Sequence, residues 1–422
     1  MSAPMLIIAD DLTGAADCGA ACARQGRSVF VVMDGSAPPD DADVVAVDAD
    51  TRSLDATAAG ARIRQLVDRF AASPLLFKKV DSTLRGHVGS ELAAALAGRR
   101  DATGQPVTAV FASAFPATGR TIVEGRPYLH GIPLEQTEVW RHERRGAGVF
   151  LPDLMAAAGL TAALIDLAQV RGPTLPDRMA RLCGTVDVLV FDAETDADLA
   201  AITAAATSMA GETIWAGSAG LVSHVAGTRS PINATMPRPP VRPGPLLFVV
   251  GSMSSVSRRQ ADVLAQAPGM MRLDLAVSEV VASADGRPVM ERTAQLERML
   301  LGGSDVVITL TADIPDDPAH ALPLRLGLAA LAEPVAAQIG GLLVTGGETG
   351  RAVLNAMGVA GLHLQRELEP GVPLCIAPAP HRFGVVTKAG AFGDERTLLN
   401  CRQALRDLAG SFPLPSSSSD ME

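Results

Sequence analysis

Residues 5–17 read MLIIADDLTGAAD, a short apolar run followed at once by two carboxylates and a Thr-Gly pair. The apolar run predicts a strand that is buried on both faces, with a helix beginning just after it. In open parallel sheets, ligands bind beyond the carboxyl ends of the strands. Asp10 and Asp11 therefore occupy a ligand-binding position, although an Asp placed here also commonly caps the following helix.

The same alternation of strand and helix runs through the rest of the chain. Apolar runs such as Val107–Ala112 and Leu246–Val250 alternate with Ala/Leu-rich stretches such as Asp55–Ala71. This pattern predicts an α/β protein with mostly parallel sheets covered by helices. Residues 229–245 hold six prolines in 17 residues, which predicts a stiff linker. We expect an N-terminal domain over 1–230, a linker over 231–245, a C-terminal domain over 246–412 and a disordered tail over 413–422.

The composition narrows the possible classes of function. The chain has 422 residues, of which 48% are hydrophobic, and its formal net charge is −10 at pH 7. This acidic balance argues against nucleic acid or an anionic membrane as a partner, and no apolar run approaches the ~20 residues of a membrane span. Five scattered cysteines without a CxxC pair, and no signal-peptide pattern, favour a cytoplasmic location. A homodimer is the expected oligomeric state.

A second polar cluster lies in LLFKKVDSTLRGHVGSEL, residues 75–92, which contains two of the chain's three lysines. Side chains alternate along a strand, so Lys78 and Lys79 point to opposite faces and at most one of them faces a ligand. Asp81 and its neighbours supply a carboxylate base, a hydroxyl donor and a guanidinium that binds carboxylates. Helix capping explains part of this cluster, but not the whole of it.

Other polar residues of the N-terminal half carry weaker signals. Arg52 follows the apolar run Val44–Val47 and is suited to bind a substrate carboxylate, although a surface ion pair explains it equally well. Residues 114–138 read as a long polar loop, and loops of this length are usually functional. Within it, His130, Arg120 and Arg126 are candidates for substrate contact, with a packed histidine and solvated arginines as the simpler interpretation.

Three glycine-rich loops occur in the C-terminal half: GSMS at 251–254, GGETG at 346–350 and TKAGAFGD at 387–394. Small residues at a helix N-terminus allow backbone N–H groups to approach a phosphate, and Lys388 is the only lysine of this half. Each loop alone is weak evidence, since tight turns use the same residues. Together they favour phosphoryl transfer between a phosphate-binding domain and a polar-substrate domain. The P-loop, dinucleotide-binding, serine-hydrolase and zinc-protease motifs are absent.

The segments IADDLTGAAD, FKKVDSTLRGHVGSEL, GSMSSVSRRQ, VTGGETG and TKAGAFGDE occur in this order, and over residues 5–405 the chain resembles the four-carbon acid sugar kinase family. The resemblance implies an enzyme that uses ATP to phosphorylate the terminal 4-hydroxyl of a four-carbon sugar acid. KKVDSTLRG is more similar to the D-threonate kinase branch, which implies D-threonate as substrate and 4-phospho-D-threonate as product. D-erythronate and 3-oxo-tetronates are the alternative substrates. TKAGAFGD departs from the expected TKSGGFGD at Ala389 and Ala391.

The resemblance also implies a set of binding residues in each domain. The sugar acid would contact Asp10, Asp11, Arg52, Lys79, Val80, Asp81, Ser82 and Arg85, and ATP with Mg²⁺ would contact Ser252, Ser254, Gly346, Gly347, Glu348, Thr349, Lys388 and Gly390. Asp81 or Asp11 would be the base, Arg52 or Arg85 would bind the substrate carboxylate, and Lys79 or Lys388 would neutralise developing charge. A non-catalytic sensor of the same ligands is the alternative from another class, and domain closure across the linker is expected to exclude water.

Overall fold

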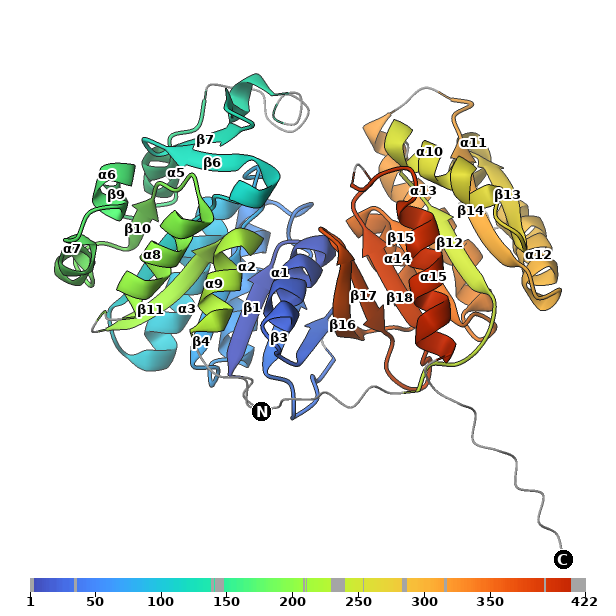
Figure 1. The fold of residues 1–422 in the computed structure, drawn as a ribbon, viewed down its shortest axis with the longest axis horizontal. Helices are drawn as coiled ribbons and strands as arrows, with labels where there is room; N and C mark the ends of the chain where they lie inside the picture. The colour runs from blue at the N-terminus through green and yellow to red at the C-terminus, as the bar shows by residue number, and fades with distance from the viewer. Residues whose placement is uncertain are drawn as a thin grey trace, which may run out of the picture. The chain divides into compact units, whose positions relative to one another are not determined.

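The computed structural model describes residues 4–33, 36–137, 140, 148–207, 209, 211–228, 240–252, 254–282, 287–314, 317–390 and 392–410. The chain divides into two compact units, Met1–Met33 with Ala37–Met236 and Asp34–Ser36 with Pro237–Glu422 (Figure 1). Most of the predicted linker, residues 231–239, and the predicted tail lie outside the described residues. None of the helices in the described ranges is long and apolar enough to cross a bilayer.

The N-terminal unit is built on a sheet in which every strand pairs in parallel with its neighbours, in the order β2-β3-β1-β4-β11-β5-β10-β9. Strands β1, β3, β4 and β5 are buried along their whole length, which explains why their sequences are mostly apolar. The strands are β1 (Met5–Ala9), β2 (Val29–Val32), β3 (Val44–Asp48), β4 (Leu75–Lys79), β5 (Val107–Ala112), β9 (Ala162–Ile165), β10 (Val188–Phe191) and β11 (Glu212–Gly217).

Helices cover both faces of this sheet (Figure 1). One face carries α1 (Leu12–Arg24), α8 (Asp196–Ala206) and α9 (Ala219–Gly227), and the other carries α2 (Ala56–Arg69) and α3 (Val88–Thr103). Shorter helices lie near the β9 edge: α5 (Leu151–Ala157), α6 (Leu167–Val170) and α7 (Leu175–Leu182). Because β3, β1, β4 and β11 are adjacent and parallel, the loops after them meet at one edge of the sheet.

The segment predicted as a long loop, 114–138, instead contains a three-stranded antiparallel sheet, so that expectation is wrong. The sheet comprises β6 (Arg120–Val123), β7 (Arg126–Leu129) and β8 (Ile132–Pro133). Two tight turns at 124–125 and 130–131 join the strands, with φ of 50° and 69° in the first and 50° and 77° in the second. Positive φ at both central residues is the geometry of a two-residue hairpin turn, which favours Gly at its second position. The pairs Glu-Gly and His-Gly, six residues apart, were the available signal.

The C-terminal unit contains a mixed sheet with the order β13-β14-β12-β15-β18-β17-β16. The first five strands are parallel, and β17 and β16 continue the sheet in antiparallel pairing. The strands are β12 (Leu246–Val250), β13 (Met270–Ala276), β14 (Asp305–Thr311), β15 (Gly341–Thr345), β16 (Gly361–Glu369), β17 (Val372–Ile376) and β18 (Gly384–Lys388). The adjacent strands β12, β15 and β18 direct three loops to the same sheet edge.

Helices of the C-terminal unit connect these strands and enclose an apolar core that includes Phe248, Leu343 and Leu405. They are α10 (Ser255–Ala265), α11 (Val277–Val281), α12 (Arg287–Leu301), α13 (Ala321–Ala332), α14 (Gly347–Ala356) and α15 (Thr397–Gly410). Helix α13 ends at Ala332. A 3-10 turn over Glu333–Val335 follows, since Pro334 lacks the N–H that would continue the α-helix.

A substitution of Gly217, the last residue of β11, tests the packing at the edge of the N-terminal sheet where the strands end. A Cβ there would lie 2.1 Å from the carbonyl oxygen of Ala112 on the neighbouring strand β5. Gly217→Ala should destabilise the protein by about 3 kcal/mol and lower the melting temperature by about 6–12 °C, measured by circular dichroism. Gly227→Ala is the control, because a Cβ there would meet only the side chain of Gln25, at 3.9 Å. This control should leave the melting temperature unchanged or raise it. Equal melting temperatures for Gly217→Ala and wild type would contradict this packing.

Candidate functional site

Arg52 is the centre of an ion-pair network at the carboxyl ends of β1, β3 and β4. Its Nε and Nη2 donate to Oδ2 of Asp10 at 2.9 and 2.8 Å, and its Nη1 lies 2.8 Å from Oδ2 of Asp11. Its Nη2 also lies 3.5 Å from Oδ1 of Asp81. Burial alone would lower the pKa of Arg52, but the three carboxylates raise it. The loop that carries Arg52 is fixed to β1, because the backbone N–H of Thr51 donates to the carbonyl of Asp10 at 3.1 Å.

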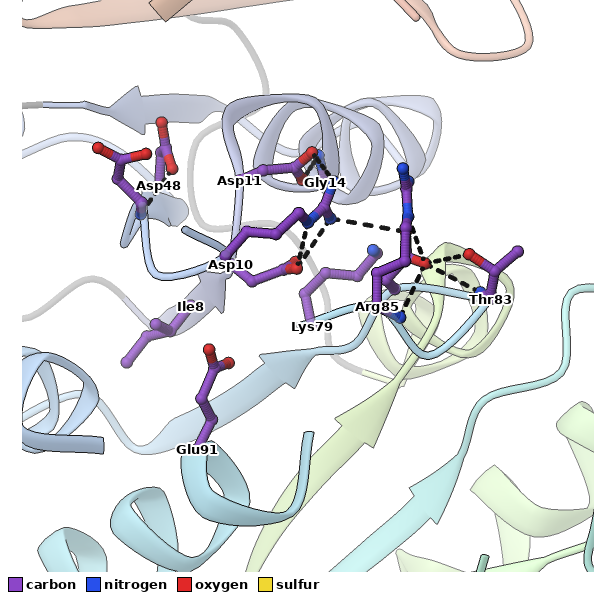
Figure 2. A network of polar contacts seen from close by, with 12 residues as sticks. Ile8, Asp10, Asp11, Gly14, Asp48, Lys79, Thr83, Arg85 and Glu91 are labelled. Atoms are coloured by element: carbon purple, nitrogen blue, oxygen red, sulfur yellow. Dashed lines mark hydrogen bonds and ion pairs between the residues drawn. The ribbon is translucent and has the colours of Figure 1, made fainter. Parts of the chain in front are cut away.

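Asp81, at the end of β4, is the most strongly bonded carboxylate of the network. Arg85 donates to both of its oxygens, from Nε at 3.1 Å and from Nη2 at 2.9 Å, and the hydroxyl of Thr83 donates to Oδ2. Burial raises the pKa of Asp81, but the hydrogen bonds and charge of Arg85, with Arg52 and Lys79, hold it well below its usual range. Figure 2 shows Thr83 and Arg85 on one side of the network and Asp10 on the other.

The two adjacent lysines of β4 point to opposite faces of the sheet, as the alternation predicts. Lys78 forms a buried ion pair with Glu91 of α3 at 2.7 Å and donates to the carbonyl of Lys79 at 2.8 Å. Lys79 points toward the network and α1, where Gly14 leaves room for it: a Cβ on Gly14 would lie 3.1 Å from its Nζ. Lys78 therefore stabilises the fold, and Lys79 is the lysine that faces the ligand-binding edge (Figure 2).

Asp11 has a structural and an electrostatic role at once. Its Oδ1 accepts the backbone N–H of Gly14 at 2.8 Å and caps α1, while Oδ2 pairs with Arg52. Burial and the adjacent Asp10 raise the pKa of Asp11, and Arg52 and Lys79 offset this only in part. The capping interpretation of this residue is therefore confirmed, while its functional role stays a prediction.

Three polar groups of the network have no protein partner within the described residues. The Asp10 Oδ1 is buried without a hydrogen bond. The Lys79 residue, 6% exposed, makes no side-chain hydrogen bond or ion pair to the described residues, and neither does the Ser82 hydroxyl. Burial lowers the pKa of Lys79, but the nearby Cys18, Asp10, Asp81 and Asp11 together raise it, so it remains a cation. Such unpaired groups indicate a site for a polar, anionic ligand.

Val80 is the remaining residue of this segment that is predicted to contact the substrate, and it is apolar. Its side chain is buried, and its backbone N–H donates to the carbonyl of Gly217 at 2.7 Å. Val80 thus joins β4 to β11 and fixes the strand end that carries Lys79 and Asp81. Its apolar side chain offers no hydrogen bond, so any polar contact of Val80 with a ligand would come from its backbone.

Arg120 is a cation that the sequence interpretation undervalued. It begins β6, and its charge interacts with both Asp81 and Arg85. Its Nη1 donates to the carbonyl of Thr118 at 3.1 Å, while its Nε is buried and has no hydrogen-bond partner. The other arginine of this small sheet, Arg126, is exposed and lies over the ring of Phe150 at 5.5 Å. Only the hairpin turns could have indicated from sequence which arginine turns toward the network.

His130 packs within the same small sheet. It occupies the first position of the second hairpin turn, and its backbone N–H donates to the carbonyl of Gly119 at 2.7 Å. A Cβ on Gly119 would lie 2.2 Å from Nδ1 of the His130 ring, so the ring covers this glycine. The His130 residue is nevertheless exposed, so the packed-histidine interpretation does not fit it, and its contact with substrate stays a prediction.

In the C-terminal unit, the three glycine-rich loops meet beyond β12, β15 and β18. The hydroxyls of Ser254 and Ser257 donate to the carbonyl of Gly390 at 3.0 and 2.7 Å, and the Ser252 N–H donates to Oγ1 of Thr345. A Cβ on Gly390 would lie 2.1 Å from the Ser252 hydroxyl oxygen, so only glycine fits there. The structure therefore joins the predicted residues of these loops. Met253 and Ala391 lie outside the described residues.

Lys388 organises the loop that follows β18. Its ammonium is 1% exposed and donates to the carbonyls of Ala389, Gly390 and Phe392 at 3.0, 3.2 and 3.0 Å. Burial lowers its pKa to about 8. Since its ammonium group already donates hydrogen bonds to three backbone carbonyls, Lys388 stabilises the conformation of this loop.

The N-terminus of α14 lies beside this loop and lacks a side-chain cap. Gly346 is its N-cap residue, with φ of 93°, and its N–H donates to the carbonyl of Lys388 at 2.8 Å. Thr349 packs against Gly251, whose Cβ would lie 2.9 Å from its methyl group, and Glu348 pairs with Arg325 of α13 at 2.6 Å. Uncapped N–H groups between glycine-rich loops favour the binding of an anion such as a phosphate.

The described residues contain no group of three or more His, Cys, Asp or Glu side chains that could hold a metal ion. The carboxylates of the N-terminal network are instead balanced by guanidinium and ammonium groups. They therefore do not form a metal cage, and any divalent cation would depend on oxygen atoms of a bound ligand.

Asp17 of α1 allows a test of the electrostatics of this site. Burial raises its pKa from 3.8 to about 7, and its Oδ1 has no partner. The folded protein then binds more protons than the unfolded chain between about pH 4 and 7, so this group lowers the free energy of unfolding as pH rises through that window. Asp17→Asn should remove this loss and stabilise the protein at pH 8 by on the order of 2 kcal/mol.

The measurement is the melting temperature of wild type and Asp17→Asn at pH 5 and pH 8. The exposed Asp40→Asn controls for the removal of one negative charge. A variant that is less stable than wild type at pH 8 would show that the ionised Asp17 is favourably paired, contrary to this account.

Comparison with known proteins identifies the family. Residues 5–225 match a family described as a sugar-binding N-terminal domain, and residues 247–398 match a nucleotide-binding C-terminal domain. The chain is similar to the D-threonate kinase of Cupriavidus necator, with 39% identity over 95% of this chain and 98% of that protein. It is also similar to the D-threonate kinase of Bordetella bronchiseptica, with 32% identity over 95% and 97%.

More distant relatives share the architecture. The D-erythronate kinase of Heliobacterium modesticaldum is 28% identical over 94% of this chain and 96% of that protein. A crystal structure from Salmonella typhimurium, described as a candidate tRNA synthase, has a TM-score of 0.80 at 20% identity, over 95% of this chain and 99% of that one. This last likeness shows the two-domain α/β fold alone. With both family domains matched in order, the chain belongs to the four-carbon acid sugar kinase family.

Proposed function

We propose that this protein is a kinase that transfers the γ-phosphoryl group of ATP to the 4-hydroxyl of D-threonate, giving 4-phospho-D-threonate and ADP. The observation that carries the proposal is the network around Arg52, in which the Lys79 ammonium, the Ser82 hydroxyl and the Asp10 Oδ1 lack partners among the described residues. A small polyhydroxy acid supplies both the hydroxyls and the negative charge that such groups bind. The relatives named as D-threonate kinases support this substrate.

In this proposal, the N-terminal unit binds and orients the sugar acid. The Asp10 Oδ1 accepts a substrate hydroxyl and Ser82 bonds another, while Arg52 and Arg85 hold the three carboxylates of the network in position. Lys79 carries a positive charge close to these groups and stabilises negative charge that develops during transfer. Phosphoryl transfer depends chiefly on such positioning and electrostatic stabilisation.

Asp11 is the carboxylate best suited to accept the proton of the 4-hydroxyl. Its pKa is raised, whereas the pKa of Asp81 is held low by Arg85, so Asp81 is the weaker base. As the bond from O4 to the γ-phosphorus forms, the bond from that phosphorus to the β–γ bridging oxygen breaks and ADP leaves. The proton of the hydroxyl passes to Asp11.

The C-terminal unit binds ATP on the loops beyond β12, β15 and β18. We assign phosphate binding to the backbone N–H groups at the start of α14 and to Ser252, while Ser254 and Lys388 hold the Gly390 loop in place. When bound, Mg²⁺ reduces the negative charge of the phosphates. Because the described residues do not form a metal cage, we assign it no protein ligands and derive no step through it.

The substrate assignment is tested by a panel of sugar acids. The release of ADP is measured with purified protein, ATP, Mg²⁺ and each of D-threonate, D-erythronate, L-threonate, L-erythronate, 3-oxo-tetronates and D-glycerate. We expect the highest kcat/KM for D-threonate. A different preferred tetronate would keep the kinase and replace the substrate. Thermal stabilisation by ATP and D-threonate without turnover would instead indicate the non-catalytic sensor.

The role of Asp11 is tested by Asp11→Asn. Asparagine keeps the helix cap, so the change removes the base with little effect on α1. We expect kcat to fall on the order of 10²–10⁴-fold with KM for ATP unchanged. The matched control is Asp55→Asn, since Asp55 caps α2 through the N–H groups of Thr57 and Ala58 and lies outside the network. Wild-type kcat in Asp11→Asn would remove Asp11 as the base.

A further inference from the structure

We propose that Arg120 binds the carboxylate of the sugar acid and thereby makes the enzyme selective for acids over neutral polyols and amides. The inference rests on the proposed function and assigns the substrate's charged end to a residue of the small antiparallel sheet. Sequence reasoning had considered Arg52 and Arg85 for this contact. Arg120 is an arginine near this edge that forms no ion pair with any carboxylate of the described residues.

The guanidinium groups of Arg52 and Arg85 are already engaged by the protein. Arg52 uses Nε, Nη1 and Nη2 on Asp10 and Asp11, and its side chain is 17% exposed. Arg85 presents Nε and Nη2 to the two oxygens of Asp81 in a bidentate pair. A substrate carboxylate that took either group would leave a buried Asp without its cation, which is costly.

Arg120 differs from both in its contacts. Within the described residues its guanidinium pairs with no carboxylate, and it makes one hydrogen bond, from Nη1 to the carbonyl of Thr118 at 3.1 Å. Its Nε is buried without a partner although its charge is felt by Asp81 and Arg85. A half-buried guanidinium next to a polar site, with donors unused, matches the planar geometry of a carboxylate.

The surrounding backbone fixes where Arg120 stands. Its N–H and carbonyl form an antiparallel bridge with Phe115, with N···O distances of 3.1 and 2.8 Å. Phe115 in turn packs against Gly220 at the start of α9, where a Cβ would lie 3.2 Å from its ring. The hairpin that carries Arg120 is therefore anchored to the same sheet edge as the network. An anchored side chain loses little freedom when a ligand binds.

Binding and selectivity are measured on wild type, Arg120→Gln and Arg120→Lys, with Arg126→Gln as the matched control from the same small sheet. The substrates are D-threonate and its uncharged analogue D-threonamide. For wild type we expect kcat/KM to favour the acid by about 100-fold. Arg120→Gln should lose about 100-fold on D-threonate, mainly through KM, and change little on the amide. Arg126→Gln should behave as wild type.

Two measurements separate failure of this inference from failure of the proposed function. Circular dichroism and melting temperature report folding, and if Arg120→Gln is misfolded, Arg120→Lys is decisive: it keeps the charge but loses the bidentate geometry and should retain selectivity only in part. Calorimetric titration with D-threonate measures binding and needs no turnover. If wild type binds D-threonate without kinase activity and the Arg120 variants bind it more weakly, the role of Arg120 is supported although the proposed kinase function fails. Equal losses on acid and amide, wild-type selectivity, or no D-threonate binding by wild type would overturn the inference.

Discussion

The burial of Arg52 among three carboxylates is the interaction on which the functional edge of the N-terminal unit depends. Asp10 and Asp11 follow β1, Asp81 follows β4 and Arg52 follows β3, so the network exists only because parallel pairing brings these strand ends together. Removing one partner from such a buried group typically costs about 3–5 kcal/mol, because a charge is left uncompensated. Several ion pairs and hydrogen bonds thus hold the charged side chains of the network to one another (Figure 2).

The three lysines of the chain show how one residue type has different structural roles. Lys78 forms a buried ion pair with Glu91, and Lys388 donates hydrogen bonds to three carbonyls of its own loop. The Lys79 side chain forms neither an ion pair nor a hydrogen bond with the described residues. The chain thus uses two of its three lysines to shape the structure. The third, Lys79, is a buried cation at the edge of the sheet to which we assign ligand binding, and in the proposed mechanism its charge stabilises the phosphoryl transition state.

Much of this was predictable, for identifiable reasons. Strands such as Val107–Ala112 and Leu246–Val250 were recognised from unbroken apolar runs, and Asp10, Arg52 and Asp81 from their places at strand ends. The antiparallel sheet of β6, β7 and β8 was not predicted. Its strands are short and half-exposed and are joined by Glu-Gly and His-Gly turns, so their sequence shows little alternation of apolar and polar residues. Sequence motifs do not show which arginines are already in ion pairs, or that Lys388 donates hydrogen bonds to its own loop. Both depend on side-chain geometry.

The most direct test of the central claim, that strand-end residues of one unit bind the sugar acid and glycine-rich loops of the other bind ATP, is a crystal structure with both ligands. D-threonate and the non-hydrolysable β,γ-methylene analogue of ATP would be bound together. The account predicts D-threonate against Asp10, Lys79 and Ser82, and the triphosphate at Ser252 and the start of α14. A tetronate bound elsewhere, or a triphosphate on the Arg52 network, would contradict it.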